Sequence, residues 1–126
     1  MRSSLFTFAK AALAAACIAA APAHAAPQAA TAIEIDGLFS ALLTSGCEFN
    51  RNGNWYSAKQ ASQHLQGKYD YLLKKNLLPS TEAFIDRAAS QSSLSSKPYL
   101  VRCPGQPEIN SKQWFTKQLE QIRAEK

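Results

Sequence analysis

The sequence predicts an α+β domain in which a small antiparallel sheet of about three strands packs against four helices. Apolar residues recur at helical spacing in four separate segments. An Asn-Gly pair separates two short strand-like runs, as is typical of a tight β-hairpin. The expected order is helix, strand, strand, helix, helix, strand, helix. Residues 26–126 are expected to form this single domain.

Residues 1–25 are typical of a secretory signal peptide. Arg2 and Lys10 provide a positive start, and residues 11–21 are almost wholly small and apolar. Residues 23–25, Ala-His-Ala, supply the small-x-small pattern at which a signal peptidase cuts. Cleavage after Ala25 is therefore expected, and it would place the protein in the periplasm.

The three cysteines have different expected fates. Cys17 lies in the apolar run of the signal peptide, where it loosely resembles a lipoprotein cleavage site. However, Lys10 leaves only six apolar residues before it, fewer than the roughly 7–15 of such a region, which favours export without a lipid anchor. Cys47 and Cys103 remain, and an even pair in an oxidising compartment is expected to form a disulfide.

A metal site built on Cys47 and Cys103 is the alternative to a disulfide. It would need further ligands, but His64 is the only histidine after the signal peptide and no Cys-x-x-Cys spacing occurs. We therefore expect neither a metal nor a cofactor.

The charge of the chain excludes one class of partner. The formal charge is +5, and it falls to +3 when Arg2 and Lys10 are removed with the signal peptide. This excess is spread along the chain without a basic stripe, so we expect no nucleic-acid binding. No later stretch approaches the roughly 18 apolar residues of a membrane span. The sequence carries no signal for the oligomeric state.

The first helix is predicted to begin at Thr31 and to end near Gly46. Thr31 and Glu34 have the spacing of a capping box. A glycine such as Gly46 commonly ends a helix. The apolar residues between them follow the i, i+3, i+4 pattern of a buried face: Ile35, Leu38, Phe39, Leu42 and Leu43.

A hairpin follows, in which Asn52-Gly53 forms a type I′ turn between residues 47–51 and 54–56. Strand alternation places Cys47, Phe49 and Arg51 on one face.

Two further helices come next. Ser57 and Gln60 form a second capping box, which opens a helix that runs to about Asn76. A third helix is capped by Ser80 or Thr81.

The last segments are a loop, a strand and a helix. Five serines within residues 90–97 predict a loop, and residues 99–103 predict a short strand that could be tied to the first strand by the disulfide. The last helix is expected to begin near Asn110 or Ser111, with Trp114 at the edge of its buried face. Its predicted core residues are Phe115, Leu119 and Ile122.

Three basic side chains are candidate binding residues. His64 and Lys68 lie one turn apart on one shoulder of the second helix, where both can contact the same ligand group. Arg51, beside the hairpin turn, can bind a carboxylate or phosphate with two hydrogen bonds. Each has a structural alternative: His64 bonded to backbone, Lys68 covering apolar surface, and Arg51 protecting a strand edge.

A catalytic interpretation of the serine-rich segment is also open. Ser92 or Ser93 could act as a nucleophile with His64 or Lys97 as its base. However, Leu94 occupies the position that a Ser-x-x-Lys motif ending at Lys97 requires for serine, and no Gly-x-Ser-x-Gly motif occurs. Backbone capping by Ser92 is the alternative role.

Several of these residues form a pattern that resembles a known family. The front half reads Arg-Asn-Gly at 51–53, Tyr56, then His64-Leu65 and Lys68, and the back half reads Ser92-Ser93 and Lys-Pro-Tyr-Leu-Val at 97–101. The pattern resembles a family of short exported proteins of Gram-negative bacteria, catalogued as a domain of unknown function. The resemblance implies a periplasmic location but no established activity. It groups the matching polar positions as a tentative site: Arg51, His64, Lys68, Ser92, Ser93, Lys97 and Tyr99.

The family pattern departs from this chain at one position. Ser96 stands where the family often has glycine, which implies a tighter or strained turn before Lys97.

The residues favour a non-enzymatic binding or interaction protein whose partner is anionic. The partner could be an envelope component, a peptide or an acidic protein surface, and an inhibitor-type protein fits the same features. The alternative is a small envelope hydrolase or transferase that uses His64 with Ser92 or Ser93.

Overall fold

The computed structural model describes residues 9–18 and 29–126. The expected cleavage site after Ala25 lies outside the described residues. Residues 9–18 are exposed and contain no helix or strand, and Cys17 in this segment has a free thiol. Among the helices of these two ranges, none combines the length and the apolar character that crossing a membrane requires.

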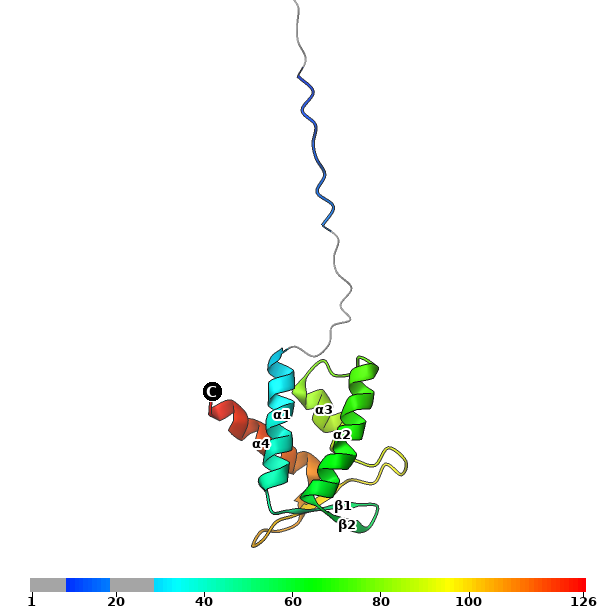
Figure 1. Cartoon of the computed structure of the whole chain (residues 1–126), viewed down its shortest axis with the longest axis vertical. Helices are drawn as coiled ribbons and strands as arrows, with labels where there is room; N and C mark the ends of the chain where they lie inside the picture. Colours follow the sequence, from blue (N-terminus) through cyan, green and yellow to red (C-terminus); the bar gives the residue numbers. More distant parts are fainter. Residues whose placement is uncertain (1–8, 19–28) are drawn as a thin grey trace, which may run out of the picture.

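The α+β class is confirmed, and the described chain forms four helices and one sheet. The helices are α1 (Ala29–Thr44), α2 (Ala58–Lys74), α3 (Thr81–Ala88) and α4 (Ser111–Ala124). The strands are β1 (Glu48–Arg51), β2 (Asn54–Ser57), β3 (Leu100–Arg102) and β4 (Ile109–Asn110). Figure 1 shows the β1–β2 hairpin at one end of α1 and α2, which lie side by side.

The sheet has four antiparallel strands in the order β2-β1-β3-β4, instead of the predicted three or so. The additional strand is β4, which pairs Ile109 with Val101 and Asn110 with Leu100. Two residues are too few to produce an alternating pattern, so no local signal predicts this strand.

The predicted start of the first helix is wrong. The helix begins no later than Ala29, so Thr31 and Glu34 lie within it and do not form a capping box. Ala29 and Ala30 are strong helix formers and extend the helix toward the N-terminus. Glu34 instead turns into the protein, where it accepts hydrogen bonds from Thr81 and Arg123.

Several predicted turns and caps are confirmed, whereas Leu43, predicted on the buried face of the first helix, is exposed. Gly46 ends α1 with φ +68°, and both Asn52 and Gly53 have the positive φ of a type I′ turn, at +52° and +88°. Ser57 forms the predicted capping box with Gln60 at the start of α2. Ser80 accepts a hydrogen bond from Ala83 N and caps α3. Ser96 has φ +60°, which confirms a strained turn at this position.

One core lies between the helices and the inner face of the sheet. Trp114 is buried in it rather than placed at its edge, because its ring packs edge-on against Phe49 and Phe115. Ile122 packs against α1 at Gly37, where an added Cβ would lie 3.0 Å from the Ile122 Cδ1. The small residue at position 37 therefore lets α4 approach α1 closely.

The predicted disulfide between Cys47 and Cys103 is present. Cys47 directly precedes β1 and Cys103 directly follows β3, and these two strands are neighbours in the sheet. The bridge therefore lies at the end of β1 that is opposite to Arg51.

Candidate functional site

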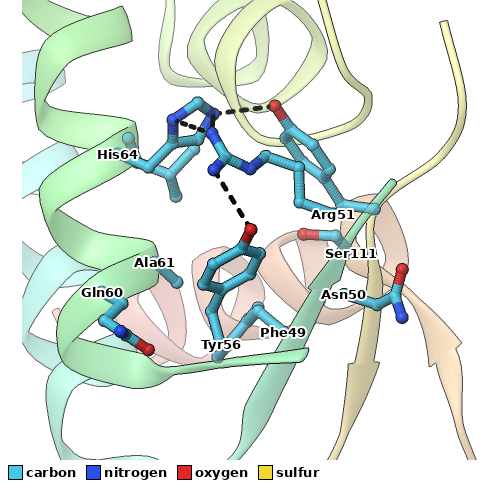
Figure 2. A pocket seen from close by; sticks show the side chains of 10 residues that line it. Phe49, Asn50, Arg51, Tyr56, Gln60, Ala61, His64 and Ser111 are labelled. Atoms are coloured by element: carbon cyan, nitrogen blue, oxygen red, sulfur yellow. Dashed lines mark hydrogen bonds between the residues drawn. The ribbon is translucent and has the colours of Figure 1, made fainter. Parts of the chain in front are cut away.

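A pocket of about 210 Å³ lies where the end of β1 meets α2 and the start of β3. The side chains around it come from both strands of the hairpin, from α2, from the residue before β3 and from the first residue of α4 (Figure 2). They are Phe49, Asn50, Arg51, Tyr56, Gln60, Ala61, His64, Leu65, Tyr99 and Ser111.

Arg51 is the central side chain of this pocket. Its Nη1 lies 2.7 Å from His64 Nδ1, and its Nη2 lies 3.4 Å from Tyr56 Oη. The guanidinium carbon is 4.9 Å from the centre of the Tyr56 ring, within the range of a cation–π contact. Figure 2 shows the guanidinium between the His64 imidazole and the Tyr56 phenol.

The contacts of His64 define its proton positions. A guanidinium only donates, so the Nδ1 that faces Arg51 must be unprotonated. The neutral imidazole then carries its proton on Nε2, which lies 3.1 Å from Tyr99 Oη. Burial is the largest cause that lowers the pKa of His64 below its usual value of 6.5, and the charges of Arg51 and Lys68 lower it further. His64 is therefore neutral at pH 7.

Lys68 lies one helical turn after His64 and reaches the same phenol. Its Nζ donates to Tyr99 Oη at 3.2 Å and to the carbonyl oxygen of Gln91 at 3.0 Å. Burial and the Arg51 charge lower the pKa of Lys68. Tyr99 Oη accepts two hydrogen bonds in this arrangement, so its own proton remains available to another acceptor.

The site has an excess of positive charge. All salt bridges of the described chain belong to other cations, namely Arg102, Lys112, Arg123 and Lys126. Arg51 and Lys68 have only neutral partners within residues 9–18 and 29–126: an imidazole, two phenols and a carbonyl. The arrangement can therefore accept an anion without breaking an ion pair.

The serine-rich segment does not join this cluster. Ser92 is buried, and its hydroxyl accepts a hydrogen bond from Asn52 Nδ2 at 3.2 Å and lies near the amides of Leu94 and Ser95. Ser93 and Lys97 are exposed, and neither side chain forms a hydrogen bond in the described part of the chain; only the backbone N–H of Lys97 donates, to Ser95 Oγ at 3.3 Å. Ser92 thus has the capping role that was the alternative to catalysis.

Comparison with protein families identifies the relatives of this chain. Residues 29–123 match the model of a family described as a family of unknown function, DUF5329. The chain belongs to the DUF5329 family. No curated protein and no solved structure matches the chain. The family's description leaves open both an exported location and a restriction to Gram-negative bacteria.

Of the ten residues that line the DUF5329 pocket, seven were not predicted as site residues, and two of these seven, Tyr56 and Ser111, carry hydroxyl groups. Tyr56 is the cross-strand partner of Phe49 and lies diagonally across from Arg51 on the same face of the sheet. The two-residue turn fixes this register, so the hairpin signal could have identified Tyr56. Ser111 was assigned only to a helix start, because its position beside Tyr99 depends on the unpredicted β4.

The DUF5329 domain offers little for metal binding. Within the described residues, no three side chains of the types His, Cys, Asp and Glu gather into a group that could hold a metal ion. The pocket contributes one histidine and no carboxylate. Its chemistry is that of hydrogen-bond donors beside aromatic and aliphatic surface.

Proposed function

We propose that this protein is a non-enzymatic binding protein that takes an anionic, carboxylate-bearing ligand in the Arg51 pocket. The observation that carries the proposal is the absence of a carboxylate partner for Arg51 and Lys68 within the described chain, at the wall of an open pocket. A guanidinium matches the planar, bidentate geometry of a carboxylate. Neutral partners hold Arg51 in place but leave its charge uncompensated.

The hydrogen bonds of Arg51 leave room for a ligand. A guanidinium has five N–H donors, and the contacts to His64 and Tyr56 use two of them. The 3.4 Å contact to Tyr56 is long and easily replaced. An anion would therefore gain strong, charge-assisted hydrogen bonds at small cost to the protein.

The hydrolase or transferase alternative needs a serine hydroxyl beside His64. The hydrogen-bond partners of His64 are instead Arg51 and Tyr99. The non-enzymatic proposal therefore agrees better with the contacts around the imidazole.

An NMR titration of His64 tests the proposal. We would measure the His64 pKa with three probes: acetate, inorganic phosphate and 3-phenylpropionate. An anion bound at Arg51 favours the charged imidazolium, so at least one probe should raise the His64 pKa saturably. Arg51→Gln should abolish this response, whereas Lys97→Gln, which removes the same charge from the exposed loop, should retain it. A His64 pKa that none of the three probes moves would refute the proposed function.

We also propose that the protein is exported to the periplasm. The features of residues 1–25 support this location, and a disulfide-bonded domain is suited to an oxidising compartment. The intact mass of protein from a periplasmic fraction should correspond to a chain that begins at Ala26. An acylated chain that begins at Cys17 would show a lipoprotein instead.

A further inference from the structure

We infer that the Arg51 pocket selects a small ligand that carries one carboxylate on an aromatic or branched aliphatic group. This inference rests on the proposed function and specifies its ligand class. The same chemistry is found in a free arylalkanoic acid and in the C-terminal residue of a peptide. Three features of the pocket support it: apolar surface in its wall, a restricted volume, and a set of hydrogen-bond donors that includes Arg51.

The apolar surface of the pocket would hold the tail of the ligand. Phe49 and Leu65 are buried core residues whose side chains also face the pocket, and Ala61 adds a methyl group. The rings of Tyr56 and Tyr99 supply aromatic surface. In Figure 2 the nitrogen atoms of Arg51 and His64 lie beyond the hydroxyl end of Tyr56, Phe49 lies near the opposite end of the Tyr56 ring, and Ala61 lies beside the ring. A ligand that covers this surface gains from the burial of apolar area, which a bare inorganic anion cannot do.

The volume limits how much of the ligand the pocket can enclose. Drug-sized ligands occupy pockets of roughly 300–1,000 Å³, whereas a cavity of about 150 Å³ accommodates benzene. The pocket, at about 210 Å³, lies between these sizes. It therefore accommodates one ring or branched side chain together with a carboxylate, and any larger part of a ligand would have to extend out of the open side of the pocket.

The hydrogen-bond donors of the pocket determine which head group of the ligand can bind. Arg51 has unused N–H groups, and the Tyr99 phenol retains its proton, as described above. Ser111 provides a further donor: the residue is 1 % exposed, it lines the pocket, and its hydroxyl, which is not fully enclosed, makes no hydrogen bond within the described chain. In Figure 2 this hydroxyl points into the pocket. A polar group so nearly buried favours a ligand oxygen as its partner.

Calorimetric titration of the folded protein tests the ligand class. The probes are 3-phenylpropionate, its neutral amide, acetate, inorganic phosphate and a tripeptide that ends in phenylalanine with a free carboxylate. We expect 3-phenylpropionate to bind at least about tenfold more tightly than its amide, because the amide loses a charge-assisted hydrogen bond. Acetate and phosphate should bind at least tenfold more weakly than 3-phenylpropionate. A tripeptide that binds more tightly still would identify a peptide terminus as the source of the carboxylate.

Two variants, each with a matched control, separate the roles of the head and the tail of the ligand. Arg51→Gln should remove the preference for acid over amide, and Lys97→Gln should keep it. Ala61→Leu should weaken 3-phenylpropionate binding by filling the space beside the apolar surface. Gln63→Leu adds the same side chain on the exposed part of α2, outside the pocket, and should have no effect.

The outcomes distinguish this inference from the proposed function. If acetate or phosphate binds as tightly as 3-phenylpropionate and depends on Arg51, the pocket is an anion site without selection for an apolar tail. The inference then fails and the proposed function stands. If no anion binds, both fail. If the amide binds as well as the acid, the pocket recognises apolar groups without a carboxylate, and both fail.

Discussion

At the scale of single residues, Glu34 shows how one carboxylate can join three helices. It lies in α1 and is 6 % exposed. Its oxygens accept hydrogen bonds from Thr81 of α3 at 2.7 Å and from Arg123 of α4 at 2.8 and 3.1 Å, and Lys126 lies 3.3 Å away. These contacts, of which the Arg123 bond is the strongest cause, lower the pKa of Glu34 from 4.5 to about 2. The charged form is therefore part of the folded state.

The free energy of unfolding should depend on pH through the ionisation of Glu34. Because the pKa of Glu34 is about 2 in the folded state and 4.5 in the unfolded chain, the unfolded state binds more protons between these values. The stabilisation is therefore complete above pH 4.5 and is lost as the pH falls toward 2. Glu34→Gln should lower the free energy of unfolding at pH 7 by about 1–3 kcal/mol. Its stability should also fall less than that of the wild type between pH 5 and pH 3, as measured by urea unfolding.

Glu120→Gln is the matched control for this experiment. Glu120 is exposed on α4 and forms no salt bridge in the described chain, so its variant should follow the wild-type curve. If Glu34→Gln loses stability in parallel with the wild type as the pH falls, then Glu34 does not cause the acid sensitivity.

At the scale of elements, the sequence predicted best those features that local hydrogen bonds determine. The Ser57 and Gln60 capping box and the Asn52-Gly53 turn are complete within a few residues, and both are confirmed. The Thr31 and Glu34 spacing was misleading because Glu34 contacts the distant helices α3 and α4 instead of capping its own helix. Such contacts have no local signature, so spacing alone cannot separate a cap from a tertiary ion pair.

The structure of the serine-rich segment depends partly on its own residues and partly on contacts with residues distant in the sequence. Its composition predicted a loop, and the backbone closes a turn in which Ser92 N donates to Lys97 O and Ser96 N donates to Ser92 O. The docking of this turn on the hairpin, through Asn52 to Ser92 and Ser95, depends on the tertiary fold. Local composition therefore indicated the loop but not its position.

Ser96→Gly should stabilise the protein. Ser96 adopts φ +60°, which costs an L-residue roughly 1–2 kcal/mol, whereas glycine adopts it freely but loses more backbone entropy on folding. The balance should raise the free energy of unfolding by about 0.5–1 kcal/mol in urea titrations. Ser93→Gly, at an exposed position of the same loop with an ordinary negative φ, should be neutral or destabilising. Equal effects of the two substitutions would show that strain at Ser96 is not the cause.

At the scale of the whole molecule, the sequence located part of the site. Helical periodicity placed His64 and Lys68 on one shoulder of α2, and the structure brings both to Tyr99. Arg51 completes the cluster because β1 lies between β2 and β3, so that its last residue neighbours the start of β3. This adjacency follows from strand order, which periodicity does not reveal. Lys97 and the serines were grouped with the site by the family pattern, but their contacts lie elsewhere or their side chains are exposed.

The disulfide should stabilise the fold without taking part in binding. The bridge joins residues separated by 56 positions, and closing such a loop in the unfolded chain contributes about 4 kcal/mol on the chain-entropy model. The double variant Cys47→Ala, Cys103→Ala should lose about this much in urea unfolding. At roughly 3.3 Å per strand residue, Cys47 lies about 13 Å along β1 from Arg51, so the pocket should be preserved. In the folded variant, the His64 pKa should therefore respond to 3-phenylpropionate as in the wild type. Loss of that response in a variant that is still folded would contradict this prediction. It would mean that the disulfide, by attaching β1 to β3, holds Arg51 in its place in the pocket.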